Sequence, residues 1–138
     1  MAQVDAAFPA GISARKAPRR LLVVEDDFLI GQMIGDQLLE LGHTVVGPAS
    51  SVADARALAQ DEILDGALLD WNLNGRSSGE VAEALTRRQI PFLFVTGYDK
   101  LPGGHYRDAA VLQKPFNLAT LERALERLFN QGEAPAAP

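Results

Sequence analysis

Cysteine is absent from this chain of 138 residues, and long apolar runs are absent with it. Without a thiol, the chain cannot form disulfides, bind a metal through thiolates or use a cysteine nucleophile. No apolar run approaches the roughly 18 residues that suggest a membrane span. The first residues also lack the charged start and apolar stretch of a secretion signal. These absences predict a cytoplasmic protein with no membrane partner.

Histidine and positive charge are also scarce. The two histidines, His43 and His105, have no second histidine at metal-ligand spacing, so a metal bound by imidazoles is not expected. Against 18 aspartate and glutamate residues stand 13 lysine and arginine residues, which gives a net charge of −5. An acidic chain of this kind has no general affinity for nucleic acid.

The composition predicts one globular domain with flexible ends. Hydrophobic residues make up 47% of the chain, which is enough for a real core. Residues 1–18 are rich in alanine, are interrupted by proline and glycine, and show no apolar period, so we expect a flexible tail. Residues 132–138 predict a second flexible tail, which leaves residues 19–131 as the domain.

Between these tails, short apolar runs alternate with segments of helical spacing. Short continuous apolar runs are typical of strands buried on both faces of a parallel sheet. The predicted strands are Leu21–Val24, His43–Gly47 (closed by Pro48), Ala67–Leu69, Phe92–Val95 and Val111–Gln113.

The segments between the strands carry helix signals. Apolar residues from Ile30 to Leu41 repeat at helical spacing, and Gly42 stops this helix. The caps and ends predicted for the others are Ser51 to about Gln60, Ser77 or Ser78 to about Arg88, and Asn117 to the end of a leucine-rich stretch.

Strands that alternate with helices predict an α/β fold, in which a doubly wound parallel sheet has helices on both faces. One connection departs from this pattern, the one between Thr96 and Lys114. Its middle holds Pro102, Gly103 and Gly104, which oppose a regular helix. We therefore expect the fourth helix to be short or disordered.

Four of the predicted strands end in chemically reactive residues, namely Glu25 with Asp26, Asp70, Thr96 and Lys114. The carboxyl ends of parallel strands share one edge of the sheet, where ligands bind in open α/β folds. This edge therefore gathers carboxylates, a hydroxyl and an ammonium. Such a set can bind a divalent cation and accept a phosphoryl group.

Asp70 is the predicted nucleophile, because a carboxylate can accept a phosphoryl group as an aspartyl phosphate. Mg²⁺ suits this site, since it binds through one or two carboxylates and neutralises the charge of a phosphoryl group in transfer. Asp26 and Asp70 are the predicted direct ligands. Glu25 is expected to act through a water or as an outer ligand, and the backbone carbonyl of Asn72 completes the set.

Each of these residues also has an ordinary structural interpretation. The run Glu25-Asp26-Asp27 fits a helix N-terminus, where acidic residues suit the helix dipole, and Asp27 fits that role alone. Lys114 is predicted to pair with a phosphoryl oxygen, or else to be a surface lysine at a strand end. Thr96 is predicted to donate to another phosphoryl oxygen, or else to be an ordinary strand residue. Their shared position after apolar runs favours the functional interpretation.

Four motifs in this order, VVEDD, LLDWN, VTG and QKPF, resemble the receiver domain of two-component response regulators. The resemblance covers residues 20–130 and implies a five-stranded parallel sheet of order 2-1-3-4-5. The site residues that it implies are an acidic pair at Glu25 and Asp26, a phosphoacceptor at Asp70, a switch hydroxyl at Thr96, and a lysine at Lys114 with a cis peptide bond to Pro115.

A finer resemblance concerns the segment PFLFVTGY at residues 91–98, which is similar to the signature of the FATGUY subgroup of stand-alone receivers. The segment LDWNLNG at residues 69–75 is similar as well. The subgroup is linked to sensor histidine kinases of the HWE and HisKA2 type and to stress signalling in alphaproteobacteria. The resemblance therefore implies a single-domain response regulator, for which we expect a monomer.

Two positions depart from the usual receiver pattern. Most receivers carry Tyr or Phe three residues before the lysine, where this chain has Val111, and proline four residues after the phosphoacceptor, where it has Asn74. An aromatic switch of the usual form is therefore not expected. We predict instead that Thr96 and Tyr98 form the switch and that phosphorylation orders residues 98–109.

The predicted function is thus a Mg²⁺-dependent phospho-accepting signalling domain rather than an enzyme. It would receive its phosphoryl group from a sensor histidine kinase or a phosphotransfer protein, and act through protein contacts or as a phosphate sink. An aspartate-nucleophile phosphatase of the haloacid dehalogenase kind is an alternative. However, Asp70-Trp71-Asn72 lacks the second acid of that family, and the chain lacks a cap domain. A receiver-like binding domain that is never phosphorylated is the third interpretation.

Overall fold

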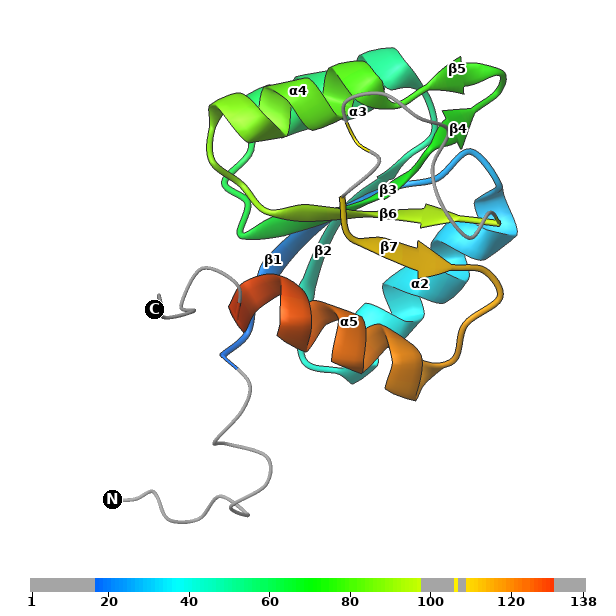
Figure 1. Ribbon diagram of the computed structural model, residues 1–138, viewed down its shortest axis with the longest axis vertical. Coiled ribbons are helices and arrows are strands. Elements are labelled where there is room, and N and C mark those ends of the chain that lie inside the picture. Colours follow the sequence, from blue (N-terminus) through cyan, green and yellow to red (C-terminus); the bar gives the residue numbers. More distant parts are fainter. Residues whose placement is uncertain (1–16, 98–105, 107–108, 131–138) are drawn as a thin grey trace.

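Five parallel strands form the central sheet of the computed structural model, which describes residues 17–97, 106 and 109–130 (Figure 1). The spatial order is β2-β1-β3-β6-β7, and every neighbouring pair is parallel. This order confirms the predicted 2-1-3-4-5 sheet. The strands are β1 (Arg20–Val24), β2 (Thr44–Ala49), β3 (Gly66–Asp70), β6 (Phe92–Thr96) and β7 (Val111–Gln113).

Helices cover both faces of the sheet, as predicted for a doubly wound fold (Figure 1). The described residues form four helices, with α3 and α4 on one face and α2 and α5 on the other. None of these helices has the length and apolar character needed to span a membrane. Their bounds are α2 (Phe28–Glu40), α3 (Val52–Asp61), α4 (Gly79–Arg87) and α5 (Leu118–Asn130).

The continuous apolar run of β1 explains why the sheet is buried on both sides. Leu22 and Val24 belong to the core beneath α3 and α4, whereas Leu21 and Val23 belong to the core beneath α2 and α5. Successive side chains of a strand point to opposite faces, so a strand covered on both faces needs apolar residues at every position. All four side chains are at most 1% exposed.

The helix caps follow the sequence at two of the three predicted positions. The Ser51 side chain accepts from the Asp54 N–H, and Asn117 Oδ1 accepts from the Thr120 N–H. Ser78 occupies the cap position of α4, but its hydroxyl makes no cap bond and lies buried without a partner among the described residues. Ser77 Oγ instead accepts from the Gly79 N–H.

The end of the second strand differs from the prediction. Pro48 does not close β2, which continues through a cis Gly47–Pro48 bond to Ala49. Proline is tolerated here because β2 is an edge strand, so no further strand needs its N–H. Gly47 is required, because its φ is +99° and a Cβ would lie 2.8 Å from the Val23 carbonyl oxygen. The register of β1 and β2 shifts between Leu22 and Val24. Beyond this shift, the Ala49 carbonyl accepts from the Glu25 N–H.

A two-stranded hairpin after β3 is a further element that the sequence reasoning did not identify. Strands β4 (Asn72–Leu73) and β5 (Arg76–Ser77) are antiparallel and are joined by Asn74 and Gly75. Their φ angles of +53° and +88° suit a tight two-residue hairpin turn, for which Asn-Gly is the preferred sequence. The predicted short fourth helix would occupy the connection between β6 and β7, most of which lies outside the described residues.

Candidate functional site

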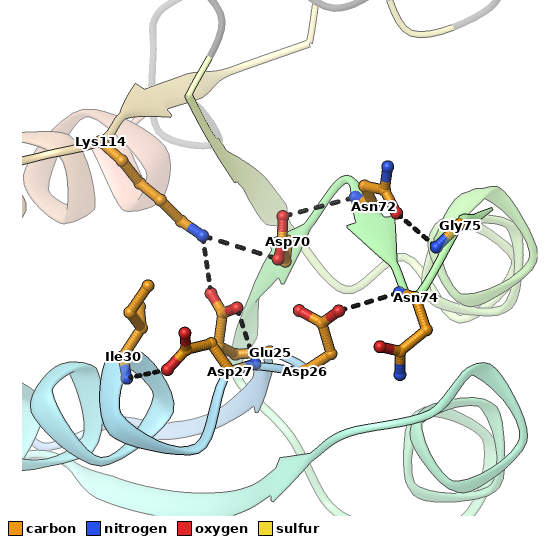
Figure 2. Close-up of polar contacts among 9 residues, drawn as sticks. All are labelled: Glu25, Asp26, Asp27, Ile30, Asp70, Asn72, Asn74, Gly75 and Lys114. Carbon is orange, nitrogen blue, oxygen red and sulfur yellow. Dashed lines mark hydrogen bonds and ion pairs between the residues drawn. The ribbon is translucent and has the colours of Figure 1, made fainter.

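The predicted carboxylates and Lys114 meet at the carboxyl edge of the sheet (Figure 2). Glu25 and Asp26 directly follow β1, and Asp70 is the last residue of β3. Thr96 ends β6, and its carbonyl accepts from the backbone N–H of Lys114 at 2.7 Å. The doubly wound topology thus assembles residues that are up to 89 positions apart in the chain.

Three carboxylates form the acidic part of the site. One oxygen from each of Glu25, Asp26 and Asp70 can be chosen so that all lie within 4.8 Å of one another. Glu25 and Asp70 are only 2% and 8% exposed, whereas Asp26 is partly exposed. Hard carboxylate oxygens on an accessible strand edge are the donors that Mg²⁺ prefers. The three residues therefore fit a small divalent cation.

Lys114 supplies the positive charge nearest to these carboxylates. Its Nζ lies 2.9 Å from Glu25 Oε1 and 3.5 Å from Asp70 Oδ2 (Figure 2). Burial alone would lower the pKa of Lys114. The hydrogen bond to Glu25 and the charges of Asp70 and Glu25 outweigh burial and raise that pKa. Lys114 is therefore held as an ammonium between two carboxylates, with its peptide bond to Pro115 in the cis form.

Asp70 resists ionisation in the absence of a cation. Burial is the largest cause, and the hydrogen bond and negative charge of Glu25 add to it, so that the pKa of Asp70 rises to about 7. The charge of Lys114 and the backbone N–H of Asn72 oppose this rise without cancelling it. The burial of Asp70 and its contact with Glu25 thus disfavour the charged form of the proposed nucleophile. A bound cation would offset this unfavourable effect.

Asp26 behaves in the opposite way. Burial alone would raise the pKa of Asp26, but hydrogen bonds outweigh it and lower that pKa. The largest of these bonds comes from the backbone N–H of Asn74, which lies 2.8 Å from Asp26 Oδ2. Asp26 therefore stays charged more readily than Asp70.

Asp27 takes the structural role that was predicted for it. It is the N-cap of α2, and its Oδ1 accepts from the Ile30 N–H at 3.0 Å. Its own backbone N–H donates to Glu25 Oε2 at 3.2 Å. Asp27 is not one of the three carboxylates that converge, so it orients the helix and Glu25 rather than a cation.

An aromatic cluster flanks Asp70 on the β6 side. Trp71 directly follows Asp70 and makes an edge-to-face contact with Phe94 at 5.2 Å between ring centroids. Tyr106 packs against Phe94 at 5.5 Å and against Trp71 at 6.4 Å. Tyr98, the predicted switch residue, lies outside the described residues.

Sequence reasoning missed two contributors to this region, Asn74 and Tyr106. Asn74 could have been found from the Asn-Gly pair, which is the strongest short signal of a hairpin. Tyr106 carried no such signal, because it lies in a segment without apolar periodicity and its partners are on β3 and β6. The functional roles of Asp70, Thr96, Lys114 and the carboxylates remain predictions, although the fold brings these residues to one edge.

Known structures resemble this fold and, in part, this sequence. No protein-family model matches the chain. The solution structure of SdrG from Sphingomonas melonis Fr1 is 44% identical, with a TM-score of 0.74, and the match covers 83% of this chain and 98% of SdrG. The receiver domain of the sensor histidine kinase PA1611 from Pseudomonas aeruginosa PAO1, which has magnesium in its active-site cleft, is 25% identical, with a TM-score of 0.69. That match covers 83% of this chain and 99% of the receiver domain.

The curated relatives are longer than the region that they share with this chain. The phyllosphere-induced regulator PhyR of Methylorubrum extorquens is 31% identical over 120 residues, which are 83% of this chain and 45% of PhyR. The chain spans about half the length of the curated relatives it matches.

Proposed function

The chain belongs to the receiver domains of response regulators, and from that premise we propose that Asp70 accepts a phosphoryl group from a sensor histidine kinase in a Mg²⁺-dependent reaction. The observation that carries this proposal is the position of Asp70. It lies at a strand end, with Lys114 Nζ at 3.5 Å and two further carboxylates beside it. Phosphoryl transfer asks mainly for positioning and charge neutralisation, which this arrangement offers.

Asp26, Asp70 and the backbone carbonyl of Asn72 are the groups that would hold Mg²⁺, with Glu25 as an outer ligand. When bound, Mg²⁺ would neutralise the charge of the carboxylates and of the phosphoryl oxygens. Asp26 is suited to direct binding because its pKa is lowered, so the residue is anionic at neutral pH. Glu25 is suited to the outer position because its Oε1 is engaged by Lys114 at 2.9 Å.

The residues of this chain would divide the transfer step between them. A carboxylate oxygen of Asp70 forms the new bond to phosphorus while the bond between phosphorus and the donor nitrogen of a phosphohistidine breaks. The bonding electrons leave with the imidazole of the donor. Lys114 would then pair with one phosphoryl oxygen, and the Thr96 hydroxyl would donate to another.

The domain would signal through contacts with other proteins, or would act as a phosphate sink. The phosphoryl donor would be a histidine kinase of HWE or HisKA2 type or a phosphotransfer protein. Thr96, with Tyr98, is the proposed switch. The phosphatase alternative finds no support in the site, because the Asn72 side chain accepts from the Gly75 N–H and offers no second acid. A location in the cytoplasm and a monomeric state belong to the same proposal.

Incubation with acetyl phosphate, followed by intact mass, tests the proposal. We expect one phosphoryl group on the wild type in the presence of Mg²⁺, and none in EDTA or in Asp70→Ala. Asp27→Asn is the matched control, because asparagine also caps helices and Asp27 lies outside the carboxylate group. A Mg²⁺-dependent phosphoryl group on Asp70→Ala would contradict the assignment.

A further inference from the structure

The backbone N–H of Asn74 acts, we propose, as the group that sets which cation the site prefers. By holding one oxygen of Asp26, it would limit that carboxylate to single-oxygen ligation and favour Mg²⁺ over Ca²⁺. This inference rests on the proposed metal site and deepens it, since it assigns a specificity role to a hairpin outside the ligand set.

The hydrogen bond itself is short and charge-assisted. Asn74 N lies 2.8 Å from Asp26 Oδ2, and the two residues are 48 positions apart (Figure 2). Bonds from an amide to a carboxylate are shorter and stronger than those between neutral groups. A cation that chelates Asp26 through both oxygens would have to break or share this bond.

The turn conformation aims the N–H of Asn74 at the site. Asn74 has a φ of +53° and Gly75 a φ of +88°, the left-handed values that a two-residue hairpin requires. The Gly75 N–H donates to Asn72 Oδ1 at 2.8 Å, which closes the turn from inside. Leu73 is 2% exposed and packs the hairpin into the core beneath α3 and α4.

The hairpin is also held from outside. Glu80 on α4 accepts from Arg76 of the hairpin and from Arg56 of α3, each at 3.4 Å. The Ser78 N–H donates to the Trp71 carbonyl at 2.9 Å, directly beyond the two strands. The ion pairs of Glu80 are exposed and contribute little. The buried Leu73 and the backbone bond from Ser78 to Trp71 hold the hairpin, so the restraint on Asp26 is present before any cation arrives.

The other two carboxylates have oxygens engaged in the same way. Asp70 Oδ1 lies 3.3 Å from the Asn72 N–H, and Glu25 is bonded through Oε1 to Lys114 and through Oε2 to the Asp27 N–H. Ca²⁺ takes six to eight oxygens and often uses both oxygens of a carboxylate, whereas Mg²⁺ needs a compact octahedron. A site whose carboxylates are already engaged by protein donors therefore favours the smaller ion.

Two substitutions at one position test the N–H together with the turn that presents it, and the amide exchange described below tests the N–H alone. Asn74→Pro removes the donor and cannot adopt a φ of +53°. Asn74→Gly keeps the donor and tolerates the left-handed conformation. Mg²⁺ and Ca²⁺ titrations would be followed by calorimetry and by the fluorescence of Trp71, which is the one tryptophan of the chain.

We expect the preference for Mg²⁺, measured as the ratio of the Ca²⁺ and Mg²⁺ dissociation constants, to fall roughly tenfold in Asn74→Pro, or about 1.4 kcal/mol. Asn74→Gly should keep the wild-type ratio. Amide exchange in the wild type adds a test that needs no variant. The Asn74 N–H should stay protected with Mg²⁺ and lose protection with Ca²⁺.

The outcomes distinguish this inference from the proposed function. An unchanged cation ratio in Asn74→Pro, or equal protection of Asn74 by both cations, would overturn the specificity role while leaving the metal site in place. Absence of a response to either cation in the wild type would overturn the metal site itself.

Discussion

The two ends of the sheet hold ion pairs of similar chemistry in different surroundings. At the amino end, Arg20 bonds to Glu62 at 2.7 Å, and the two side chains are 41% and 37% exposed. At the carboxyl end, Lys114 bonds to Glu25 at 2.9 Å, but the Glu25 side chain is only 1% exposed. The amino-end pair is solvated, whereas the carboxyl-end pair depends on protein groups.

The charge balance of the two ends differs as well. The Arg20 guanidinium also donates to the Ile63 carbonyl, and the Arg20 backbone N–H donates to Asp65. The polar groups at the amino end are therefore paired at solvent-exposed positions. At the carboxyl end three carboxylates converge, and Lys114 Nζ contacts two of them, Glu25 and Asp70. Exposed pairs contribute little to stability, whereas buried charges become costly when a partner is lost. The amino end should thus tolerate the loss of a partner, whereas the carboxyl end holds buried charges that depend on one another.

The largest effect should follow from removing the ammonium of the site. Lys114→Met leaves Glu25 buried beside Asp70 without its cation, so we expect the free energy of unfolding to fall by roughly 3 kcal/mol without metal. Urea denaturation at neutral pH measures it. A loss within about 0.5 kcal/mol would mean that Glu25 does not depend on Lys114, which would abolish the contrast between the two ends.

Neutralising Asp70 should raise the free energy of unfolding rather than lower it. The ordinary pKa of Asp70 is 3.8 and the folded-state value is about 7, so the native state keeps a proton that the unfolded chain loses. The stability of the wild type therefore falls as pH rises from about 4 to about 7. Asp70→Asn removes this dependence and should be more stable by about 2 kcal/mol above pH 7, once altered hydrogen bonding is allowed for.

Denaturation in EDTA across this pH range checks the prediction. Below pH 4 the Asp70 carboxyl is protonated in both the folded and the unfolded wild type. The gain in free energy of unfolding from Asp70→Asn should therefore vanish there. Stability curves that run parallel over the whole range would show that Asp70 titrates normally.

A smaller effect is expected from Mg²⁺ on the intact site. At ten times its dissociation constant, a ligand of the native state stabilises it by about 1.4 kcal/mol, which should raise the melting temperature. Asp26→Asn should weaken this shift, whereas the cap variant Asp27→Asn should retain it. If all three proteins respond equally, the cation binds elsewhere.

The smallest effect belongs to the amino end. Arg20→Ala should lower the free energy of unfolding by about 0.5 kcal/mol, because both partners of its ion pair are well exposed. High salt should reduce the difference further. A loss as large as that of Lys114→Met would show that burial is not what separates the two ends.

Local sequence signals were sufficient wherever the structure is decided by neighbouring residues or by periodicity. The apolar runs predicted the five strands, whereas their spatial order was implied by the resemblance to receiver domains. The caps at Ser51 and Asn117 follow from side chains that reach donors three positions away. The convergence of Asp70 and Lys114 was predictable for the same reason, since parallel strands must end at one edge.

The sequence did not predict the features that depend on residues far apart in the chain. The prediction that Pro48 closes the second strand is wrong, because proline is tolerated within a strand at the sheet edge, and only the topology decides which strand lies there. The bond from Asn74 to Asp26 spans 48 positions and appears only once the hairpin is folded. Tyr106 packs through ring contacts with Phe94 and Trp71, and no periodic pattern in the sequence predicts these contacts.

The Asn74-Gly75 turn also bears on the chemical lifetime of the protein. Asparagine before glycine is a labile pair, because no side chain hinders attack of the glycine nitrogen on the asparagine amide, which releases ammonia. Hydrolysis of the resulting ring leaves a carboxylate at position 74 and, in part, a backbone lengthened by one carbon. The bond from the Gly75 N–H to Asn72 Oδ1 should slow this ageing in the folded state. A lengthened backbone would displace the Asn74 N–H from Asp26. Protein stored at mildly alkaline pH should therefore lose its preference for Mg²⁺ over Ca²⁺ in proportion to the deamidated peptide found by mass spectrometry, and a preference that survives deamidation would show that the turn does not set it.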